Sequence, residues 1–589
     1  MLIAAFAPAP VLAQAESRTI EPSRQQPSPP TLPRPLDQDI DAIDPAEQPQ
    51  PPTPRPSDRV LAPVDGIFVY TIEFEGNTVF TDKDLEIYAV NYEDRVVAPE
   101  ELQILRRDIT QLYRSKGYAN SGVILPDQKV ENGIVTLKVI EGKLADIEVF
   151  GNKYVREGYV DRRVGYKIDE PLNVEQLKNN LNQLQQDPLI AQVNSELRPG
   201  LAPGEDILRV RIEEDDRFQT SFSFDNYRSP TVDEYRGTVF QSVRGPFGIG
   251  DIFNTRIALT GGSTDLTASY VAPFTAYGAT VEAYVTSTDS SVEETDLKKL
   301  GFETESKTYG LLTSWPVHQS ASSSLTLLAG AEKKTTDTTS DIDEDFFEFR
   351  DKGSQTGFSV IPGIEGWIRN DKNVFAGRLT MPIGLDAFDS TQDDDRSGGG
   401  FAGDPAFQDP CVRAKGGSSV GSCADSDFVF LLGQGQYLRL LGFLNSQFIA
   451  RTTFQYTFEP LMSMYKLSVG GRYSVRGFRE GYFTRDNGLA ATAEWQVPLF
   501  VDANTEWLNI RGVLFSDYGY AWDDKNRFSI EGRDSIWSAG VGVLWNPLGW
   551  LKGELFYGLD LKEANDRERP DDALQDDGIH FQLQVTKTF

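Results

Sequence analysis

Apolar and polar residues alternate along most of the chain from residue 217 to the C-terminus. In the first alternating segment, Phe222 and Phe224 fall on one face, while Ser221 and Ser223 fall on the other. A period of two residues is typical of β-strands, whose successive side chains point to opposite faces of a sheet. Similar segments continue to the last residue, and the pattern predicts about sixteen strands, an even number.

The connections between these segments differ regularly in length. Short links such as 370–372 and 546–550 alternate with long polar links such as 389–426 and 459–485. Outer-membrane barrels have short periplasmic turns and longer outer loops. In lipid, an open sheet edge would leave backbone groups unpaired, so the sheet must close. The sequence therefore predicts a transmembrane β-barrel of about sixteen antiparallel strands over residues 217–589, rather than a β-sandwich.

The preceding part of the chain mixes strand and helix patterns, and it contains a repeat. Ile72, in an alternating segment, recurs 75 positions later as Ile147, and Leu102, in a helical pattern, recurs at the same offset as Leu177. Repetition at a fixed period indicates tandem structural units. Each copy contains a strand, helices and two further strands. The sequence predicts two α+β modules, over residues 66–142 and 143–216.

The N-terminal residues predict export. Residues 1–15 form an apolar run ending in Ala13-Gln14-Ala15, the small-x-small pattern of a signal-peptidase site, so we expect a signal peptide. Residues 16–65 are rich in proline and predict an extended linker, and the sequence leaves open whether part of this linker forms a plug helix. No later apolar run approaches the roughly 20 residues that a transmembrane helix needs, so any membrane crossing must use strands.

Charge and cysteine content narrow the class of protein. The chain has 57 basic and 88 acidic side chains, a formal net charge of −31, which argues against a nucleic-acid partner because phosphates repel such a surface. Its two cysteines, Cys411 and Cys423, lie in one polar segment. In an exported protein this spacing predicts a disulfide, and the lack of nearby histidine argues against a zinc site.

Candidate catalytic and metal motifs are weak. Residues 417–421, GSSVG, match a hydrolase pattern, but no predicted strand precedes them and no helix follows them. The acidic runs 341–345, 393–395 and 571–577 lack the spacing of a calcium loop, and we expect them to lie in solvated outer loops. Nothing resembles a phosphate-binding loop. The sequence therefore predicts a protein that is not an enzyme and that uses no cofactor or metal.

A short motif between two predicted strands has the composition of a loop tip. It consists of Val475, Arg476, Gly477 and Phe478. Glycine permits a tight turn at such a tip. Arginine presents a planar fork that can fix a carboxylate in both position and orientation.

A later strand supplies the matching carboxylate, since it contains Asp517 and Gly519, and the chain ends on an alternating strand with the aromatic Phe589. Together with the loop-tip motif, the stretch YANSGVILPDQ at 118–128 and VIEG at 139–142, these features resemble the two-partner secretion outer-membrane transporters. This TpsB class includes the filamentous haemagglutinin and haemolysin transporters. The resemblance covers roughly residues 66–589.

The resemblance implies an architecture and a set of site residues. It implies two periplasmic polypeptide-transport-associated (POTRA) modules, a sixteen-stranded barrel and one loop folded back into the lumen. Arg476 at the loop tip is then expected to pair with Asp517 on the inner wall. Alternation along that strand would turn Val513 and Phe515 inward as well. Phe589 would be the signal by which barrel-assembly machinery recognises the chain for insertion into outer-membrane lipid.

The same resemblance implies a function. The POTRA modules would capture an exported β-helical (TpsA-like) passenger in the periplasm, through sheet edges that can add an unfolded strand. The barrel would then secrete the passenger across the outer membrane without nucleotide. An alternative is an outer-membrane protein insertase of the barrel-assembly class, which shares the Arg-Gly tip but usually has three or more POTRA modules. A passive porin is a poorer fit because diffusion needs no capture module.

Overall fold

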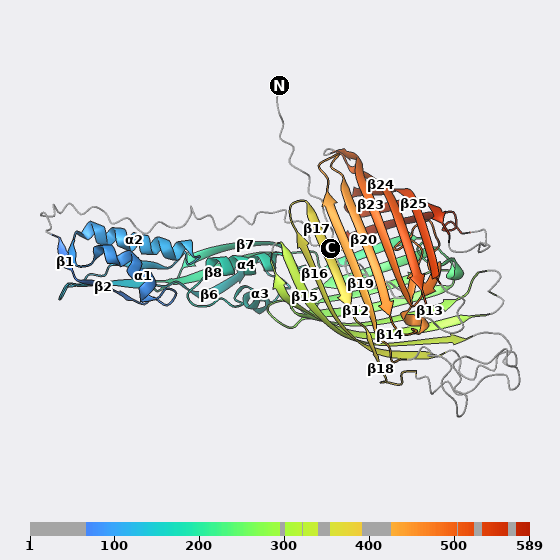
Figure 1. The fold of residues 1–589 in the computed structure, drawn as a ribbon, viewed down its shortest axis with the longest axis horizontal. Coiled ribbons are helices and arrows are strands. Elements are labelled where there is room, and N and C mark those ends of the chain that lie inside the picture. Colours follow the sequence, from blue (N-terminus) through green and yellow to red (C-terminus); the bar gives the residue numbers. More distant parts are fainter. Residues whose placement is uncertain are drawn as a thin grey trace, which may run out of the picture. The chain divides into compact units, whose positions relative to one another are not determined.

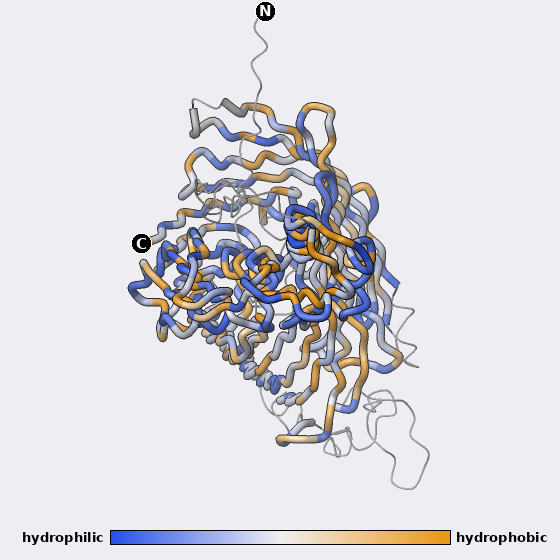
Figure 2. Tube along the Cα trace, turned by 90° about the vertical axis from the view of Figure 1, so that its left-hand side faces the viewer, coloured by the Kyte–Doolittle hydropathy of each residue, from blue (hydrophilic) through white to orange (hydrophobic). Residues whose placement is uncertain are grey.

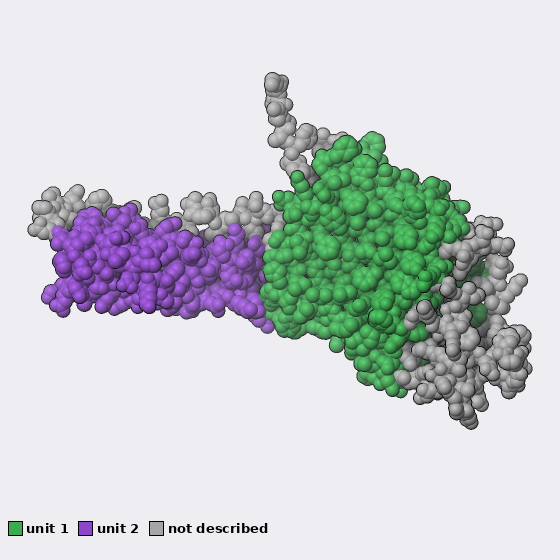
Figure 3. Space-filling model, in the orientation of Figure 1, with its two compact units in different colours: residues 1–37, 216–246, 251–589 green, residues 38–215, 247–250 purple. Residues whose placement is uncertain are grey.

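A computed structural model describes residues 66–294, 298, 301–320, 322–339, 354–391, 426–502, 505–523, 533–563 and 573–589. The described residues fall into two compact units, which are coloured separately in Figure 3. One unit contains residues 66–215 with 247–250, and the other contains residues 216–246 and 251–589. The predicted signal peptide and linker, residues 1–65, lie outside the described residues.

The smaller unit consists of two α+β modules with the same topology (Figure 1). In the first, β2 pairs in parallel with β5, and β4 pairs antiparallel with β5. In the second, β6 pairs in parallel with β8, and β7 pairs antiparallel with β8. The elements of the first module are β1 (Ile67–Val69), β2 (Thr71–Glu75), α1 (Asp82–Ala89), η2 (Val90–Tyr92), β3 (Arg95–Val97), α2 (Pro99–Ser115), β4 (Gly122–Ile124) and β5 (Ile134–Ile140). Those of the second are β6 (Lys143–Phe150), α3 (Glu157–Val164), α4 (Val174–Gln185), β7 (Ile190–Pro199) and β8 (Glu205–Glu214).

Helix caps and apolar spacing explain the long helices of the modules. Helix α2 begins with Pro99, and Glu101 accepts the Ala98 amide at 2.9 Å, so an otherwise unpaired donor is satisfied. Helix α4 begins after Asn173, whose side chain accepts the Glu175 amide at 3.0 Å. The apolar residues of both helices recur every three or four positions and are buried against the sheet of their module.

In each module, a carboxylate at the end of the last strand accepts hydrogen bonds from the loop that follows the first strand of the main sheet. Glu141 accepts the amides of Thr78 at 2.7 Å and Val79 at 3.0 Å, and the hydroxyl of Tyr113 at 2.9 Å. Glu214 of the second module likewise accepts three successive amides, from residues 153–155. Burial opposes ionisation of Glu141, but the hydrogen bonds from Thr78, Val79 and Tyr113 outweigh burial and hold its pKa below the usual range.

The larger unit is a closed antiparallel barrel (Figure 1). Its first strands are β9 (Phe218–Asp225), β10 (Arg236–Arg244), β11 (Ile252–Leu259), β12 (Ser263–Pro273), β13 (Thr280–Ser291), β14 (Glu303–Gln319), β15 (Ser323–Thr339) and β16 (Gln355–Arg369). The chain continues through β17 (Asn373–Thr380), β18 (Ile383–Leu385), β19 (Phe430–Leu440), β20 (Gln447–Thr457), β23 (Asn487–Asp502), β24 (Thr505–Trp522), β25 (Arg533–Leu548), β26 (Leu551–Lys562) and β27 (Ile579–Thr588). A short 3-10 helix, η3 (Pro230–Val232), follows β9.

Pairing of the last strand with the first closes the barrel, since Leu583 of β27 lies opposite Phe224 of β9. Strands β17 and β18 both pair with β16, so they are two pieces of one barrel strand interrupted at Met381 and Pro382. The described residues therefore form a sixteen-stranded barrel. This confirms the predicted fold class, and closure leaves no sheet edge to face lipid.

Alternation separates an outer face from an inner face on each strand. On β24, Leu514 is 50% exposed and Tyr518 is 41% exposed, whereas Val513, Phe515 and Asp517, at the alternate positions, are buried. Figure 2 shows hydrophobic and hydrophilic residues alternating along the barrel strands. The expectation that Val513 and Phe515 turn inward together with Asp517 is met. None of the described helices is both long enough and apolar enough to cross a membrane.

We predict that Glu141→Gln destabilises the first module by about 1–3 kcal/mol at neutral pH, since an amide cannot accept all the donors that surround the carboxylate. All described α-helices lie in the two modules. Circular dichroism at 222 nm during a urea titration of the full-length protein in detergent therefore measures their unfolding.

The effect should depend on pH. Because the folded-state pKa of Glu141 is lowered, its stabilisation is present above the unfolded-state pKa and is lost as the pH falls through the folded-state value. Glu131, which is largely exposed beside Lys129, provides a control. Equal urea midpoints for Glu141→Gln and Glu131→Gln at neutral pH would contradict the prediction.

Candidate functional site

The connection between β20 and β23 folds back against the inner wall of the barrel. It spans residues 458–486 and contains η6 (Ser463–Tyr465) and a short hairpin of β21 (Leu467–Val469) and β22 (Phe483–Arg485). The hairpin side chains of Val469 and Phe483 are buried against Ala521 of β24 and Ile536 of β25. These wall residues belong to the inward-facing set, so the connection lies on the lumen side. We call it the inward loop.

The tip of the inward loop is fully enclosed by protein. Val475 is 0%, Arg476 is 1% and Phe478 is 2% exposed. Val475 and Phe478 belong to the same apolar cluster as the hairpin. An arginine this deeply buried requires partners for its charge and its donors.

Asp517 of β24 provides the principal partner. Nε of Arg476 donates to Oδ2 of Asp517 at 2.7 Å, and Nη2 donates to Oδ1 at 2.8 Å. The backbone amide of Arg476 also donates to Oδ2, at 3.0 Å. Asp517 itself is 1% exposed. This two-pronged pair with an added amide contact fixes both the side chain and the backbone of the tip against the wall.

Further wall residues contribute to the environment of Arg476. Glu494 of β23 lies 2.7 Å from Nη1 of Arg476, and Arg451 of β20 approaches the same Glu494 oxygen at 3.0 Å. The Phe515 ring centroid lies 3.7 Å from the guanidinium carbon. A flat cation over an aromatic face gains a cation–π attraction. The inward orientation of Phe515 therefore places its ring against the guanidinium of Arg476 and stabilises it there.

Glycines allow the loop and the wall to approach this closely. Gly477 has φ of +93°, and a Cβ there would lie 3.1 Å from the backbone carbon of Gly558 on β26. Gly578 also packs directly against Gly558, since a Cβ on Gly578 would be 2.0 Å from the Gly558 oxygen. On β24, a Cβ on Gly519 would come within 2.5 Å of Val469. Side chains at these positions would separate the loop from the wall.

Four further basic residues of the inward loop form ion pairs that the sequence prediction missed. Arg479 donates to Asp576 at 2.8 Å, although Asp576 belongs to an acidic run that we expected to be solvated. That expectation is wrong for this residue, because its carboxylate balances a loop cation. The other pairs are Arg472 with Glu554 at 3.0 Å, Arg485 with Asp534 at 2.5 Å and Lys466 with Asp486 at 3.1 Å. The concentration of basic residues between 466 and 485 was the available sequence signal.

The other site residues predicted from the sequence are not part of the Arg476 site. Phe589 is 58% exposed, and its backbone pairs with Phe218 of β9 through hydrogen bonds of 2.8 and 3.1 Å. Cys411 and Cys423, with the disulfide predicted between them, lie outside the described residues. In the part of the chain that is described, no group of three or more His, Cys, Asp and Glu side chains could hold a metal ion.

Sequence comparisons agree with this architecture. The haemolysin secretion/activation protein family ShlB/FhaC/HecB matches residues 204–544, more than half of the chain, and the ShlB-type POTRA domain matches residues 67–142. The outer membrane transporter CdiB of Dickeya dadantii is 23% identical over 211 residues, 34% of this chain and 37% of that protein. The heme/hemopexin transporter protein HuxB of Haemophilus influenzae is 25% identical over 186 residues, 31% of this chain and 32% of that protein. The chain thus matches about a third of the length of these relatives.

Two solved structures share the fold over nearly the whole chain. CdiB from Escherichia coli has a TM-score of 0.63 at 18% identity and covers 92% of this chain and 95% of that chain. CdiB from Acinetobacter baumannii has a TM-score of 0.59 at 16% identity, and the match covers 96% of this chain and 95% of that chain. With the family match to the barrel and the POTRA match to the first module, the chain belongs to the haemolysin secretion/activation family ShlB/FhaC/HecB, the two-partner secretion transporters of the outer membrane, whose POTRA domains are periplasmic.

Proposed function

We propose that this protein captures an exported partner polypeptide in the periplasm through its POTRA modules and secretes it through the barrel without nucleotide. The inward loop, held by Arg476 to Asp517, controls that passage. The observation that carries the proposal is the burial of Arg476 between Asp517 and Glu494 on the inner wall. This contact fixes the inward loop in a defined position inside the barrel, on the path that a passing polypeptide would take.

The energetics of the tip support a control role. Breaking a buried ion pair by removing one partner is destabilising by about 3–5 kcal/mol, because the remaining charge stays desolvated. The tip would therefore rest on the wall as a defined state. If a passenger strand displaces part of the inward loop, new hydrogen bonds to that strand must offset the lost contacts. The loop would then respond to a client and not to small solutes.

The first POTRA module offers a surface for capture. Phe68 of β1 and Val96 of β3 lie directly opposite each other and are 53% and 57% exposed. Cross-strand apolar pairs of this kind suit an incoming strand with alternating side chains. Strand β4 is an edge of the main sheet of the same module and leaves backbone groups for strand addition. We infer that an unfolded, β-forming passenger binds here before it enters the barrel.

The energy for export would come from the passenger. We infer that its folding into a β-helix outside the cell draws the rest of the chain outward. The barrel-assembly machinery would insert the transporter itself, with Phe589 as the recognised terminus. An insertase of the barrel-assembly class remains the alternative function, but such proteins usually have three or more POTRA modules, and two are present in the described residues.

We predict that Arg476→Ala leaves the barrel assembled but lowers passenger secretion at least tenfold, because the tip loses its attachment to Asp517 and Glu494. Heat-modifiable migration in gels reports assembly, and the passenger in culture medium reports secretion. Arg378→Ala is the matched control, since Arg378 pairs with Glu365 at 2.6 Å within the wall and not with the inward loop. Normal secretion by Arg476→Ala, or equal loss in both variants, would refute the control role.

A second prediction separates the transporter from the insertase. Deletion of the gene should remove one large protein from the culture medium and leave other outer-membrane proteins at their usual amounts. Quantitative proteomics of medium and outer membranes measures both. A general loss of outer-membrane barrels would instead favour the insertase.

A third prediction concerns capture. Phe68→Ser should lower secretion roughly tenfold, since burial of an aromatic side chain on binding is worth about 1.5–3 kcal/mol. Leu201, fully exposed in the second module, gives the control Leu201→Ser. Unchanged secretion by Phe68→Ser would place the capture surface elsewhere.

A further inference from the structure

An apolar furrow crosses the outer wall of the barrel. Its floor is a row of small residues that pair directly across five neighbouring strands: Gly366, Gly377, Gly435, Thr452 and Ala491. The furrow has a volume of about 850 Å³ and is lined almost entirely by apolar atoms. That volume lies within the range of ~300–1,000 Å³ typical of ligand sites.

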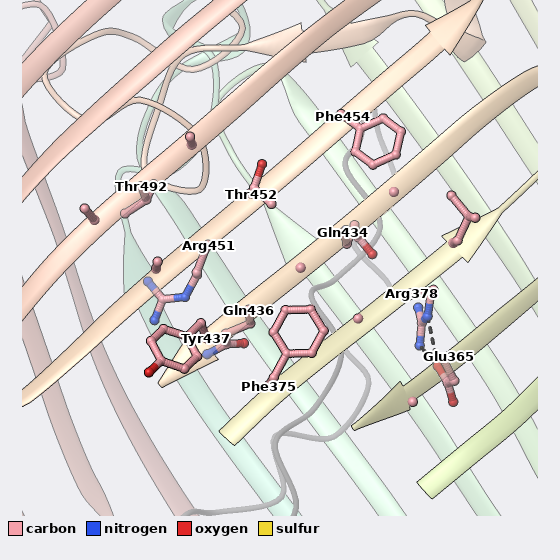
Figure 4. Close-up of a pocket in the computed structure, with 18 of the residues that line it drawn as sticks. Glu365, Phe375, Arg378, Gln434, Gln436, Tyr437, Arg451, Thr452, Phe454 and Thr492 are labelled. Atoms are coloured by element: carbon pink, nitrogen blue, oxygen red, sulfur yellow. Dashed lines mark hydrogen bonds and ion pairs between the residues drawn. The ribbon is translucent and has the colours of Figure 1, made fainter. Parts of the chain in front are cut away.

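The furrow faces lipid and not the lumen. On the strands that form its floor, Phe375 is 56% exposed and Phe454 is 38% exposed. Figure 4 shows the rings of Phe375, Tyr437 and Phe454 standing beside the bare strands. The neighbouring Glu365 and Arg378 alternate to the opposite face, where they form their ion pair. The floor is therefore largely the backbone of the sheet, exposed toward the membrane because three of its residues are glycines and the other two have small side chains.

Such a furrow needs an occupant that follows its shape. An empty groove would forfeit the dispersion contacts of its walls, and water would meet almost no polar partner there. In a bilayer the available apolar occupant is a lipid acyl chain, which is flexible and narrow enough to lie on a glycine row. The bulky Phe375 and Phe454 beside the row would hold such a chain laterally.

Two cationic side chains lie beside the furrow, beyond the edge that Tyr437 lines and in the direction of the strand ends. Arg439 is the next outward-facing residue after Tyr437 on β19, about 7 Å further along the strand. It lies opposite Asn373, whose side chain accepts the Tyr437 hydroxyl at 2.8 Å, and Lys372 adjoins Asn373 in the turn. Arg439 and Lys372 are exposed, and neither forms an ion pair within the described residues.

These cations lie at the barrel end that carries the short turns and the chain entry from the POTRA modules. This is the periplasmic end, where the membrane leaflet consists of glycerophospholipids. Phe448 lies opposite Arg439, and Trp495 lies opposite Phe448. Aromatic residues of this kind mark the depth of lipid headgroups. A basic residue at that depth attracts the negative charge of an anionic lipid headgroup.

We propose that the furrow is a binding site for an anionic glycerophospholipid of the periplasmic leaflet. One acyl chain lies along the row from Gly377 to Ala491, and the headgroup phosphate contacts Arg439 and Lys372. Two unpaired cations in a protein with a formal charge of −31 favour an anionic headgroup over one that carries an amine. The furrow faces lipid, on the opposite side of the wall from the inward loop.

The test is native mass spectrometry of the full-length protein in detergent, with phosphatidylglycerol or phosphatidylethanolamine added at equal concentration. The wild type should retain one phosphatidylglycerol in preference to phosphatidylethanolamine. Gly377→Leu fills the furrow without strain, since a Cβ there meets its nearest atom at 3.5 Å. It should lower retention about tenfold, as expected for two displaced methylene contacts. Arg439→Gln should lower retention about fivefold and weaken the headgroup preference, since Lys372 remains.

Matched controls are Gly553→Leu and Lys587→Gln, which alter an outward glycine and a cation on strands outside the furrow. Both should retain phosphatidylglycerol as the wild type does. Three outcomes would overturn the proposal. They are no retained phospholipid in the wild type, equal retention in Gly377→Leu, or loss of a dimer in Gly377→Leu. The last would make the furrow an interface between two copies of this chain.

Discussion

Every backbone amide and carbonyl of the barrel must find its partner within the sheet, because hydrocarbon offers none. The pairing of β27 with β9 meets this constraint by closing the sheet. Closure in turn gives each strand one face toward lipid and one toward the lumen. Once those faces are distinct, polar residues such as Asp517 and Glu494 can be placed inside without exposing a charge to the membrane.

The polar interior then becomes a surface on which a loop can fold. The inner wall contributes carboxylates, and the inward loop contributes basic side chains that pair with them. An acidic wall alone would repel itself, so the loop stabilises the interior as well as occupying it. Apolar contacts from Val475 and Phe478 exclude water from the tip and strengthen the pair of Arg476 with Asp517.

Sequence patterns predicted the parts of this structure that follow from local periodicity. Alternation predicted the strands, and the 75-residue repeat predicted two modules whose elements recur in the same order. The proximity of Arg476 and Asp517 was expected only through a family resemblance, since 41 residues separate them. The partners Glu494, Arg451 and Asp576 were not foreseen. Their contacts depend on strand register and on the path of the inward loop across several strands, and neither follows from the composition of any single segment.

Three glycines pack against one another where the inward loop meets the wall. Gly477 of the loop approaches Gly558 of the wall, and Gly578 packs against Gly558 as well. Three chain segments share one point, and the absence of a side chain on each is useful only while the other two also lack one. A methyl group on Gly477 or Gly558 would force the inward loop and the wall apart, and one on Gly578 would collide with the Gly558 oxygen. Substitutions there should thus be strongly non-additive, with the first change causing most of the damage and a second adding little. Such positions are expected to change together during divergence or to stay fixed as a set.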